Sequence, residues 1–542
     1  MPYKLTIIGG GSSFFTPGLM QFLARSQVLR GSRVTLMDID PHRLEVMAKL
    51  AQHLVRHLEA DLRVEATTDR RAALTGADFV ISSIAVGGFE AWEKDLEIPA
   101  KYGVYMATGD SIGPGGMMRA FRHIPPLVEM CRELKEVSPN AWVFNYTNPA
   151  TAIAMALRGV AGDRAFSLCS GTCLPRLGGW GLGGIPAEEL ILPAPAAGLN
   201  HCAAVLALRF KDGRDALPTV RERVESPLAK WVLDTYGVLP YPASHWAEFF
   251  PSLCRLAEPY RGRLQGLKME HGLQVHDMAH DSARVTQWEG LLARWARGET
   301  PDMNLEDLPE AEMFEVVDLI EALLENRNAV YVVNLPNRGA IDNLPDDAIV
   351  EVSSVVGGYG IRPIHVGPLP EALAAHLRRH IAVQKLTAEA ALTGDRRIAR
   401  QAFLHDPQVE AACTPAQAGA LLDELLAAHA EHLPQFASGA AESPRFTSNL
   451  PLLLITSARQ CRSRGSYCRA TEGRRASALP CRSNQRGLVE AKGEEASMAV
   501  RLFAYRLFAS SPPTTNLSPG ASTLNRRAAS GTIAATSAGS PL

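Results

Sequence analysis

Residues 4–17, KLTIIGGGSSFFTP, set a strand, a glycine-rich turn and a helix start in immediate succession. The apolar and β-branched residues before the glycines are typical of a strand buried in a parallel sheet. Small residues let the backbone approach a pyrophosphate, and the free N–H groups of the following helix start face its negative charge. The sequence therefore predicts a phosphate-binding turn. Its candidate cofactor-binding residues are Gly9, Gly11, Ser12, Ser13 and Phe14.

The match of this turn to the dinucleotide fingerprint is imperfect, because Phe14 stands where a third glycine normally lets helix and strand pack closely. A second predicted strand, residues 34–37, strengthens the case. It ends in Asp38, near the expected position of the acid that binds a ribose 2′-OH. These features together predict NAD(H) as the cofactor, and Arg43 lies close enough in sequence to keep NADP(H) open.

Composition and net charge limit the classes of protein to which this chain can belong. A chain of 542 residues is long enough for two or more domains, and 46% hydrophobic and 21% charged residues are ordinary for a globular protein. A formal net charge of −2 gives no reason to expect nucleic acid or a membrane as a partner. The chain opens on a strand without a signal peptide, so the expected location is the cytoplasm. Nine scattered cysteines argue against a disulfide framework.

Predicted strands and helices alternate from residue 4 to about residue 150, which indicates βαβ units and a parallel, doubly wound Rossmann-like sheet of the α/β class. Ligands of such sheets bind beyond the carboxyl ends of the strands. The loops expected at those ends are rich in Gly, Asn, Ser or Thr and comprise residues 9–16, 85–88 and 145–149. Further strands are expected at 78–84 and 142–146, and a helix at 41–59.

Two polar stretches follow these strands. Asp110 and Ser111 precede a Gly-Pro-Gly-Gly turn, and a basic amphipathic helix with Arg119 comes next. The second stretch, NYTNPA at the end of a strand, carries Asn145 and Asn148. Each pattern is compatible with an ordinary turn as well as with a binding site.

The alternation restarts after residue 165. A short predicted strand, residues 166–171, carries Cys169, and GLNHCA supplies Asn200 and His201. A cysteine and a histidine about thirty residues apart do not form a zinc-finger spacing, so spacing alone is weak evidence for a metal.

Residues 236–251, YGVLPYPASHWAEFFP, are turn-rich and aromatic and contain Tyr241, His245 and Glu248. Such a loop caps a pocket or fills a surface groove, and both readings stay open. Farther along the chain, helices are expected at 310–326, 369–405 and 415–432, and a strand–turn–strand pattern at 330–352.

The composition changes after about residue 439, where Ser, Arg, Ala and Pro dominate and hydrophobic periodicity ends. This favours a disordered tail, and it resembles the translation of a shifted reading frame. The predicted organisation is a dinucleotide-binding domain over residues 1–165, an α+β C-terminal domain over 166–437 and a disordered tail over 438–542.

Eight stretches, in this order along the chain, carry a resemblance to a known family. They are GGGSSFFTP (9–17), MDIDPHRL (37–44), VGGFEAWEKDLEIPAKYG (86–103), GPGGMMRAFRHIP (113–125), NYTNPA (145–150), LC (168–169), GLNH (198–201) and HDP (405–407). Together they resemble the family 4 glycoside hydrolases, which require NAD and a divalent metal. The resemblance covers about residues 3–435.

The resemblance implies a lactate/malate dehydrogenase-like Rossmann domain followed by a domain that binds substrate and metal. The metal ligands of the family match Cys169 and His201, with Mn²⁺ or a similar ion expected. The asparagines of NYTNPA, which line cofactor and sugar in the family, match Asn145 and Asn148. Family members are commonly dimers or tetramers, so we expect a homodimer or homotetramer.

The resemblance also implies an unusual hydrolytic chemistry, outside the two-carboxylate scheme of most glycosidases. NAD⁺ removes hydride from sugar C3, and the resulting ketone, polarised by the metal, acidifies the proton at C2. A base takes that proton, the C1–O bond breaks by elimination, water adds to the double bond, and NADH returns the hydride. There is no net oxidation, and both α- and β-linkages are accessible.

Departures from the family pattern leave the acid and the base open. Many members carry His, Asn or Asp directly after the metal-binding cysteine, whereas this chain has Ser170, so Asp110 is the substitute candidate for the acid. The base lies beyond the metal-binding histidine in the family. Tyr241 is the first candidate and His245 the second, and a shifted alignment would place Phe249 there.

One departure bears on the substrate. Members that act on 6-phospho-sugars usually carry an arginine where this chain has Trp92, and an indole can stack on a sugar but cannot neutralise a phosphate. We therefore expect an unphosphorylated hexoside or uronide. Arg119 or Arg122 would pair with a uronate carboxylate or only anchor their helix. The expected substrate-binding residues are Trp92, Arg119, Asn148 and Asn200.

Two alternatives remain at this level. A 2-hydroxyacid dehydrogenase of the same fold would show net NADH production and no need for Cys169. A non-catalytic NAD-binding sensor is suggested by the missing acid at Ser170.

Overall fold

The computed structural model describes residues 2–169, 172, 182–241, 243–254, 278–299 and 314–437. The predicted tail, 438–542, and Ser170 lie outside the described residues.

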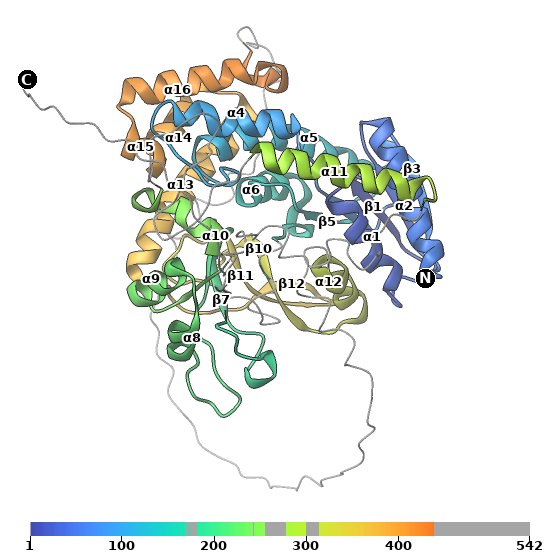
Figure 1. Cartoon of the computed structure of the whole chain (residues 1–542), viewed down its shortest axis with the longest axis horizontal. Coiled ribbons are helices and arrows are strands. Elements are labelled where there is room, and N and C mark those ends of the chain that lie inside the picture. The colour runs from blue at the N-terminus through green and yellow to red at the C-terminus, as the bar shows by residue number, and fades with distance from the viewer. Residues whose placement is uncertain are drawn as a thin grey trace, which may run out of the picture.

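Within the described residues, twelve strands form one sheet, and the pairs in the first half of its strand order are parallel. Figure 1 shows the helices around this sheet. The strand order β3-β2-β1-β4-β5-β6 is that of a dinucleotide-binding fold, which confirms the predicted doubly wound Rossmann-like sheet. The crevice of such a sheet lies where the order reverses, between β1 and β4. The parallel strands are β1 (Lys4–Ile8), β2 (Arg33–Met37), β3 (Arg63–Thr67), β4 (Phe79–Ser82), β5 (Trp142–Asn145) and β6 (Ala165–Ser167).

The second half of the sheet is antiparallel and continues from β6 without a break. Asn334 of β10 pairs with Ser167 of β6, and the order runs on as β10-β11-β7-β8-β9, with β12 beside β11. These strands are β7 (Ala196–Leu199), β8 (Cys202–Val205), β9 (Leu239–Tyr241), β10 (Ala329–Pro336), β11 (Ile349–Gly357) and β12 (Gly360–Pro363). The second half of the described chain is thus α+β, as expected.

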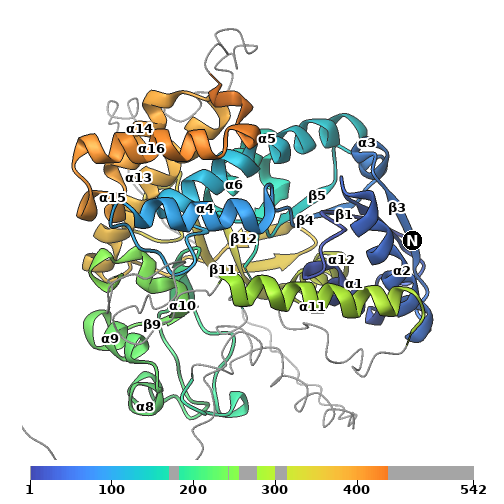
Figure 2. The same ribbon diagram turned by 45° about the horizontal axis from the view of Figure 1, so that its top comes forward.

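Helices cover both faces of the sheet. Phe121 of α5, Phe144 of β5 and Ile153 of α6 are fully buried where helix and sheet meet. Figures 1 and 2 show α4 with α13, α14 and α16 on one side of the molecule, and α11 running along α2. The helices of the first half are α1 (Phe15–Arg25), α2 (Pro41–His57), α3 (Arg70–Leu74), α4 (Gly88–Ala100), α5 (Gly113–Val137) and α6 (Ala150–Ala161).

The helices of the second half include two that lie close to the site described below, α10 and the single-turn η4. The bounds are α8 (Leu217–Arg223), α9 (Pro227–Tyr236), α10 (Ala243–Trp246), η4 (Ala247–Phe249), α11 (Met278–Ala296), α12 (Phe314–Glu325), α13 (Glu371–Thr393), α14 (Arg396–His405), α15 (Pro407–Ala412) and α16 (Pro415–Ala428).

Several boundaries differ from those expected. The Gly-Pro-Gly-Gly stretch is the first turn of α5 and not a turn before it. The helix expected at 369–405 is two helices, because Gly394 ends α13 with φ +67° and Asp395 caps α14. Residues 204–210, AVLALRF, have the apolar character of a strand, but the structure has there only the end of the short β8. Strand β3 and helix α11 had no counterpart among the expected elements.

In the described part of the chain, every helix is too short or too polar to cross a lipid bilayer.

Candidate active site

The glycine-rich turn connects β1 to α1 at the edge of the crevice. The N–H groups of Gly9 and Gly10 both donate to the carbonyl of Met37, at 3.0 and 2.8 Å. Gly9 has φ +86°, and a Cβ there would lie 2.3 Å from the carbonyl oxygen of Ser83. Only glycine fits this approach of β1 to the loop after β4, which explains the first glycine of the pattern.

Asp38 lies directly beside the turn, as the sequence predicts. Its Oδ2 accepts the N–H of Gly11 at 2.9 Å, and its Oδ1 accepts the N–H of Asp40 at 3.0 Å. A Cβ on Gly11 would stand 2.9 Å from this carboxyl group. The acid and the turn therefore form one unit at the carboxyl ends of β1 and β2.

The rest of the turn contacts α1 and α11. Ser12 Oγ accepts the N–H of Phe15 at 3.1 Å, and the ring of Phe14 meets that of Phe15 edge-on. Ser13 Oγ donates to Glu289 of α11 at 3.1 Å, and the same carboxylate oxygen lies 3.2 Å from the Arg43 guanidinium. Two predicted cofactor-binding residues thus meet a carboxylate.

Asn145 lies at the end of β5 and is fully buried. Its Nδ2 donates to the carbonyl of Thr147 and to Ser167 Oγ, and its Oδ1 accepts from Ser82 Oγ at 3.0 Å. Its amide is used within the protein, so this arrangement favours shaping the loop over direct contact with a cofactor.

Three titratable residues meet beyond the strand ends. Asp110, His201 and His245 each offer a ligand atom, and these atoms lie within 4.8 Å of one another. The two imidazoles stack with ring centroids 3.9 Å apart. His201 has φ +66°, a left-handed conformation that is uncommon outside glycine and typical of functional turns. Cys169 is buried and interacts with His201. The two residues that the resemblance identified as metal ligands are therefore neighbours.

Hydrogen bonds fix the orientation of Asp110 and His201. Asn148 Nδ2 donates to Asp110 Oδ2 at 2.8 Å, and Ser111 Oγ donates to Asp110 Oδ1 at 2.8 Å. His201 Nδ1 lies 2.7 Å from Ser111 Oγ. Because the one hydroxyl proton of Ser111 goes to Asp110, Oγ accepts from Nδ1–H, which leaves Nε2 of a neutral ring as the ligand atom.

Electrostatics keep the cluster charged. Burial raises the pKa of Asp110, but the two imidazoles and the Arg119 guanidinium outweigh burial and hold that pKa well below its usual range. Burial lowers the pKa of His201, but Cys169 and Asp110 hold it well above its usual value, which favours a ring protonated on both nitrogens when no metal ion is bound. A metal ion at Nε2 would displace the proton there and leave the neutral ring as its ligand. An ionised Asp110 is suited to binding a cation or accepting a proton, which favours these roles over protonating a leaving group.

Tyr241 ends β9 close to this cluster. It is buried, and within the described residues its hydroxyl has no hydrogen-bond partner. Burial raises its pKa well above the usual value, and the charges of Glu351 and Cys169 raise it further. Phe249, the position that a shifted alignment selects, is fully buried with its ring against His380 of α13.

The expected substrate-binding residues flank the cluster. Trp92 Nε1 donates to the carbonyl of Thr108 at 2.7 Å, and the Arg119 guanidinium lies 5.6 Å from the indole ring centroid. Arg119 Nε is buried and meets no hydrogen-bond acceptor in the part of the chain that the structure describes. Arg122 makes a bidentate ion pair with buried Asp95, at 2.9 and 2.6 Å, and so anchors α5 to α4.

Sequence reasoning left two acids of this region without a role. Glu351 on β11 is fully buried and accepts from Asn200 Nδ2 and Asn334 Nδ2, both at 2.9 Å, so it fixes the residue before His201. Glu248 accepts the N–H groups of residues 108 and 109. A lone acid inside an apolar strand, IVEVSSVVG, and an acid inside an aromatic run were the available signals.

Comparisons with known proteins identify the family of the chain. Residues 4–174 match the model of the Family 4 glycosyl hydrolase, and residues 196–409 match the Family 4 glycosyl hydrolase C-terminal domain. An alpha-galactosidase of Rhizobium meliloti is 32% identical, over 80% of this chain and 90% of that protein. An alpha-galacturonidase of Bacillus subtilis is 31% identical, over 75% and 93%.

The fold agrees as well. The crystal structure of a 6-phospho-alpha-glucosidase from gut microorganisms, in complex with NAD and Mn²⁺, superposes with a TM-score of 0.67 at 24% identity, covering 81% of this chain and all of that chain. The family matches favour the hydrolase over the simple dehydrogenase. They span both halves of the described sheet, so the protein belongs to the family 4 glycosyl hydrolases and is a glycoside hydrolase.

Proposed function

We propose that the protein hydrolyses unphosphorylated hexosides or uronides with NAD and a divalent metal, at the cluster of Cys169, His201, Asp110 and His245. The observation that carries this proposal is the meeting of these four side chains, which are far apart in sequence, beyond the carboxyl ends of the sheet. That edge also holds the glycine turn, so a sugar between them would face both groups.

The donor set fits a divalent transition ion. The carboxylate of Asp110 and the two imidazoles offer hard and intermediate ligand atoms within 4.8 Å of one another, with His245 half-buried. The thiol of Cys169, which interacts with His201, adds a soft ligand atom, and this set accommodates Mn²⁺ or a neighbouring ion. Ser111 orients His201 from behind, as the outer partners of metal-binding histidines do.

The glycine turn fits a dinucleotide. The parallel order β3-β2-β1-β4-β5-β6 creates the crevice, and the close approach of Gly11 to Asp38 leaves no space for a side chain at the turn. Asp38, beside the turn at the end of β2, would accept a ribose hydroxyl, as in NAD-binding proteins of this fold. Arg43 is shared between Asp40 and Glu289, which gives no support to a 2′-phosphate.

A bound nicotinamide and a divalent ion would supply hydride transfer and Lewis-acid polarisation. The chain supplies orientation and proton transfer. Asn148 and Ser111 hold Asp110 in place as an anion. Tyr241 is the proposed base for the sugar C2 proton, since it ends β9 beside the cluster and its hydroxyl has no partner among the described groups. Burial and the charges of Glu351 and Cys169 raise its pKa, and the positive charge of a divalent ion at the cluster would act in the opposite direction. His245 is the second candidate.

The side chains near the cluster support an unphosphorylated substrate. Trp92 offers an indole face, and Arg119 stacks on it with a buried Nε that is free to meet a hydroxyl or carboxylate. The names of two relatives, an alpha-galactosidase and an alpha-galacturonidase, denote a neutral hexoside and a uronide. A cytoplasmic location and a homodimer or homotetramer stay predictions.

The test is a panel of aryl glycosides and aryl glycuronides, with and without a 6-phosphate, assayed with NAD⁺ and Mn²⁺. We expect phenol release without accumulation of NADH, and incorporation of solvent deuterium at sugar C2. NADH that accumulates without phenol would support a dehydrogenase. Cleavage confined to the 6-phosphorylated members would contradict the substrate proposal.

Variants test the assigned residues. Cys169→Ser should lose Mn²⁺ affinity and phenol release, whereas Cys413→Ser, a half-buried thiol elsewhere, should lose neither. Tyr241→Phe should abolish deuterium incorporation at C2 and leave NAD⁺ affinity unchanged. A Cys169→Ser protein with every activity intact would point to a non-catalytic NAD-binding protein.

A further inference from the structure

The turn that carries Asp110 is held by a side chain from a distant part of the sequence. Glu248, in η4, directs its Oε1 to two consecutive backbone donors, the N–H groups of Thr108 and Gly109, the second at 2.9 Å. Glu248 is fully buried. Two N–H groups on one carboxylate oxygen cap the turn as a ligand would, and charge-assisted bonds of this kind are among the strong ones.

The capped turn ends in the side chains that face His201. Gly109 has φ +59°, and a Cβ there would lie 2.6 Å from Leu96, so the backbone has little room to shift. Asp110 and Ser111 follow directly, and both contact His201. Trp92 fixes the opposite side of the turn through the carbonyl of Thr108.

Glu248 is itself fixed from behind. Its backbone carbonyl accepts from Gln408 of α15, and the carbonyl of Phe249 accepts from His376 and His380 of α13 at 2.7 and 3.0 Å. The acid therefore connects the helical layer around α13 and α15 to the Asp110 turn.

Burying the carboxylate of Glu248 costs free energy, because the charged group is removed from water. Burial, together with the charge of Asp110, raises the pKa of Glu248 to about 7, although the two N–H bonds act in the opposite direction. Its second oxygen, Oε2, is buried and has no hydrogen-bond partner in the described portion of the structure. A side chain kept at such a cost is expected to have a role beyond stability.

We propose that Glu248 is a positioning residue of the active site, which holds Asp110 and Ser111 against His201 by accepting both N–H groups of the turn. The proposal rests on the proposed function of the Asp110–His201 cluster. It concerns an acceptor and not a proton donor, because all of the contacts of Glu248 with the turn are made through Oε1.

Two substitutions separate these roles. In Glu248→Gln the amide oxygen still accepts both N–H groups, so we expect Mn²⁺ affinity and kcat within about threefold of the wild type. In Glu248→Ala the turn loses its cap. Loss of an outer partner typically weakens metal binding 10–100-fold, and misplacement of about 1 Å costs about 100-fold in rate. We therefore expect Mn²⁺ affinity to fall at least tenfold and kcat to fall about 100-fold, with NAD⁺ affinity unchanged.

The measurements are titration calorimetry with MnCl₂ alone, with NAD⁺ alone, and steady-state kinetics on the best aryl glycoside. Glu129→Ala, which removes an exposed acid of α5, is the control and should change none of them. A Glu248→Gln protein as impaired as Glu248→Ala overturns the proposal in favour of a proton-bearing role. A folded Glu248→Ala protein with wild-type Mn²⁺ affinity also overturns it.

Calorimetry keeps this result separate from the proposed function. If the wild type cleaves none of the glycosides, the proposed substrates are wrong, while the Mn²⁺ titrations still decide the role of Glu248. If Glu248→Ala fails to fold, Glu248→Gln still separates an acceptor from a proton-bearing role, because a loss of Mn²⁺ affinity in this variant would overturn the proposal.

Discussion

At the scale of single residues, two imidazoles of α13 share one acceptor. His376 and His380 both place Nε2 at the carbonyl of Phe249, so both rings carry their proton on that nitrogen. Burial lowers the pKa of His380 to about 3, and the charge of His376 acts in the same direction. The pair thus holds Phe249, next to Glu248, through two Nε2–H donors, and burial favours the neutral form of His380.

This shift predicts an acid-labile fold. The folded pKa of His380, about 3, lies below its unfolded value of 6.5, so the unfolded chain binds the extra proton first. Stability from this residue is fully present above pH 6.5 and is lost as the pH falls toward 3. Between pH 6.5 and 5 the loss is about 2 kcal/mol, at about 1.4 kcal/mol per pH unit.

Urea denaturation at pH 7 and pH 5 measures this loss. His380→Gln keeps a donor at the end of the side chain but cannot take up a proton, so its stability should fall less between the two pH values than that of the wild type. His365→Gln, at an exposed position, should follow the wild type. Equal losses in wild type and His380→Gln would exclude His380 as the source.

The same scale shows what the sequence can predict of the site. Asp38 ends one predicted strand, Cys169 lies in another, and His201 belongs to the GLNH motif, so local sequence indicates their chemistry. The contacts of Glu248 with residues 108 and 109 could not be predicted, because they join segments about 140 residues apart. The contact of Glu351 with Asn200 could not be predicted either, since the two residues are about 150 positions apart and only the tertiary structure brings them together.

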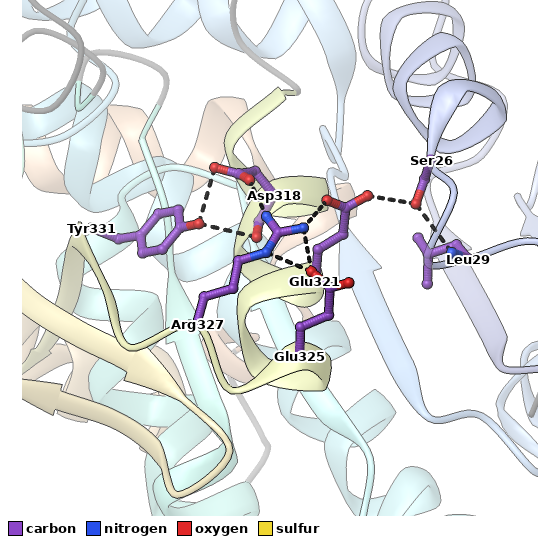
Figure 3. A network of polar contacts seen from close by, with 7 residues as sticks. All are labelled: Ser26, Leu29, Asp318, Glu321, Glu325, Arg327 and Tyr331. Carbon is purple, nitrogen blue, oxygen red and sulfur yellow. Dashed lines mark hydrogen bonds and ion pairs between the residues drawn. The ribbon is translucent and has the colours of Figure 1, made fainter. Parts of the chain in front are cut away.

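At the scale of elements, a network of acids joins α12 to two neighbours (Figure 3). Arg327 lies 2.8 Å from Asp318, 2.8 Å from Glu321 and 2.6 Å from Glu325, all on α12. Glu321 also accepts from Ser26, after α1, and the hydroxyl of Tyr331 on β10 donates to Asp318. One guanidinium therefore pairs with three carboxylates of α12 and reduces the repulsion among them.

Arg327→Met should leave three mutually repelling carboxylates at this junction. We expect a loss of about 2 kcal/mol in the free energy of unfolding, since the acids are partly buried and breaking such pairs costs more than breaking exposed ones. Urea titrations at low salt and at 0.5 M NaCl test the cause, because screening should reduce the loss. Arg294→Met removes an exposed pair with Glu299 and should change little.

The contacts of Glu289 in α11 predict that its carboxylate competes with the cofactor at the glycine-rich turn. Glu289 is bonded by Ser13 Oγ and the Arg43 guanidinium, two groups that an anionic dinucleotide would also attract. Glu289→Gln removes the competing charge, so NAD⁺ should bind about threefold to tenfold more tightly in titration calorimetry. Glu299→Gln, beyond the end of the same helix, is the control. Unchanged or weaker binding by Glu289→Gln would show that the carboxylate does not compete with the cofactor.

Elements were predictable where their pattern is local. Helix α2 has Asp40 as its cap and Pro41 at its start, and its bounds agree with expectation within two residues. Strand β3, RVEAT, was not predicted, because it is an edge strand with mostly exposed or half-exposed side chains and no apolar run. In α11 the described contact that fixes the helix is tertiary, since Trp288 donates to the carbonyl of Ser13.

At the scale of the whole molecule, the sheet crosses the expected domain boundary. The sequence placed that boundary at residue 165, whereas β6 continues to Ser167 and pairs there with β10. The family likewise divides its models between residues 174 and 196. The sheet and the bridge from Glu248 to the Asp110 turn both join the halves, and the larger hydrophobic cluster contains residues of both. A smaller cluster, which includes Leu208, Leu239 and Tyr241, lies in the second half alone.

This continuity predicts that the two halves unfold together. Differential scanning calorimetry should give one unfolding transition for the described sheet. NAD⁺ should raise the midpoint temperature of this whole transition, although the proposed dinucleotide site lies in the first half alone. At NAD⁺ concentrations about 100 times Kd, the free energy of unfolding should increase by about 2.7 kcal/mol. Mn²⁺, whose proposed ligands come from both halves, should raise the midpoint temperature of the same transition. Two transitions, of which NAD⁺ moves only one, would mean that the halves are separate cooperative units in spite of their common sheet.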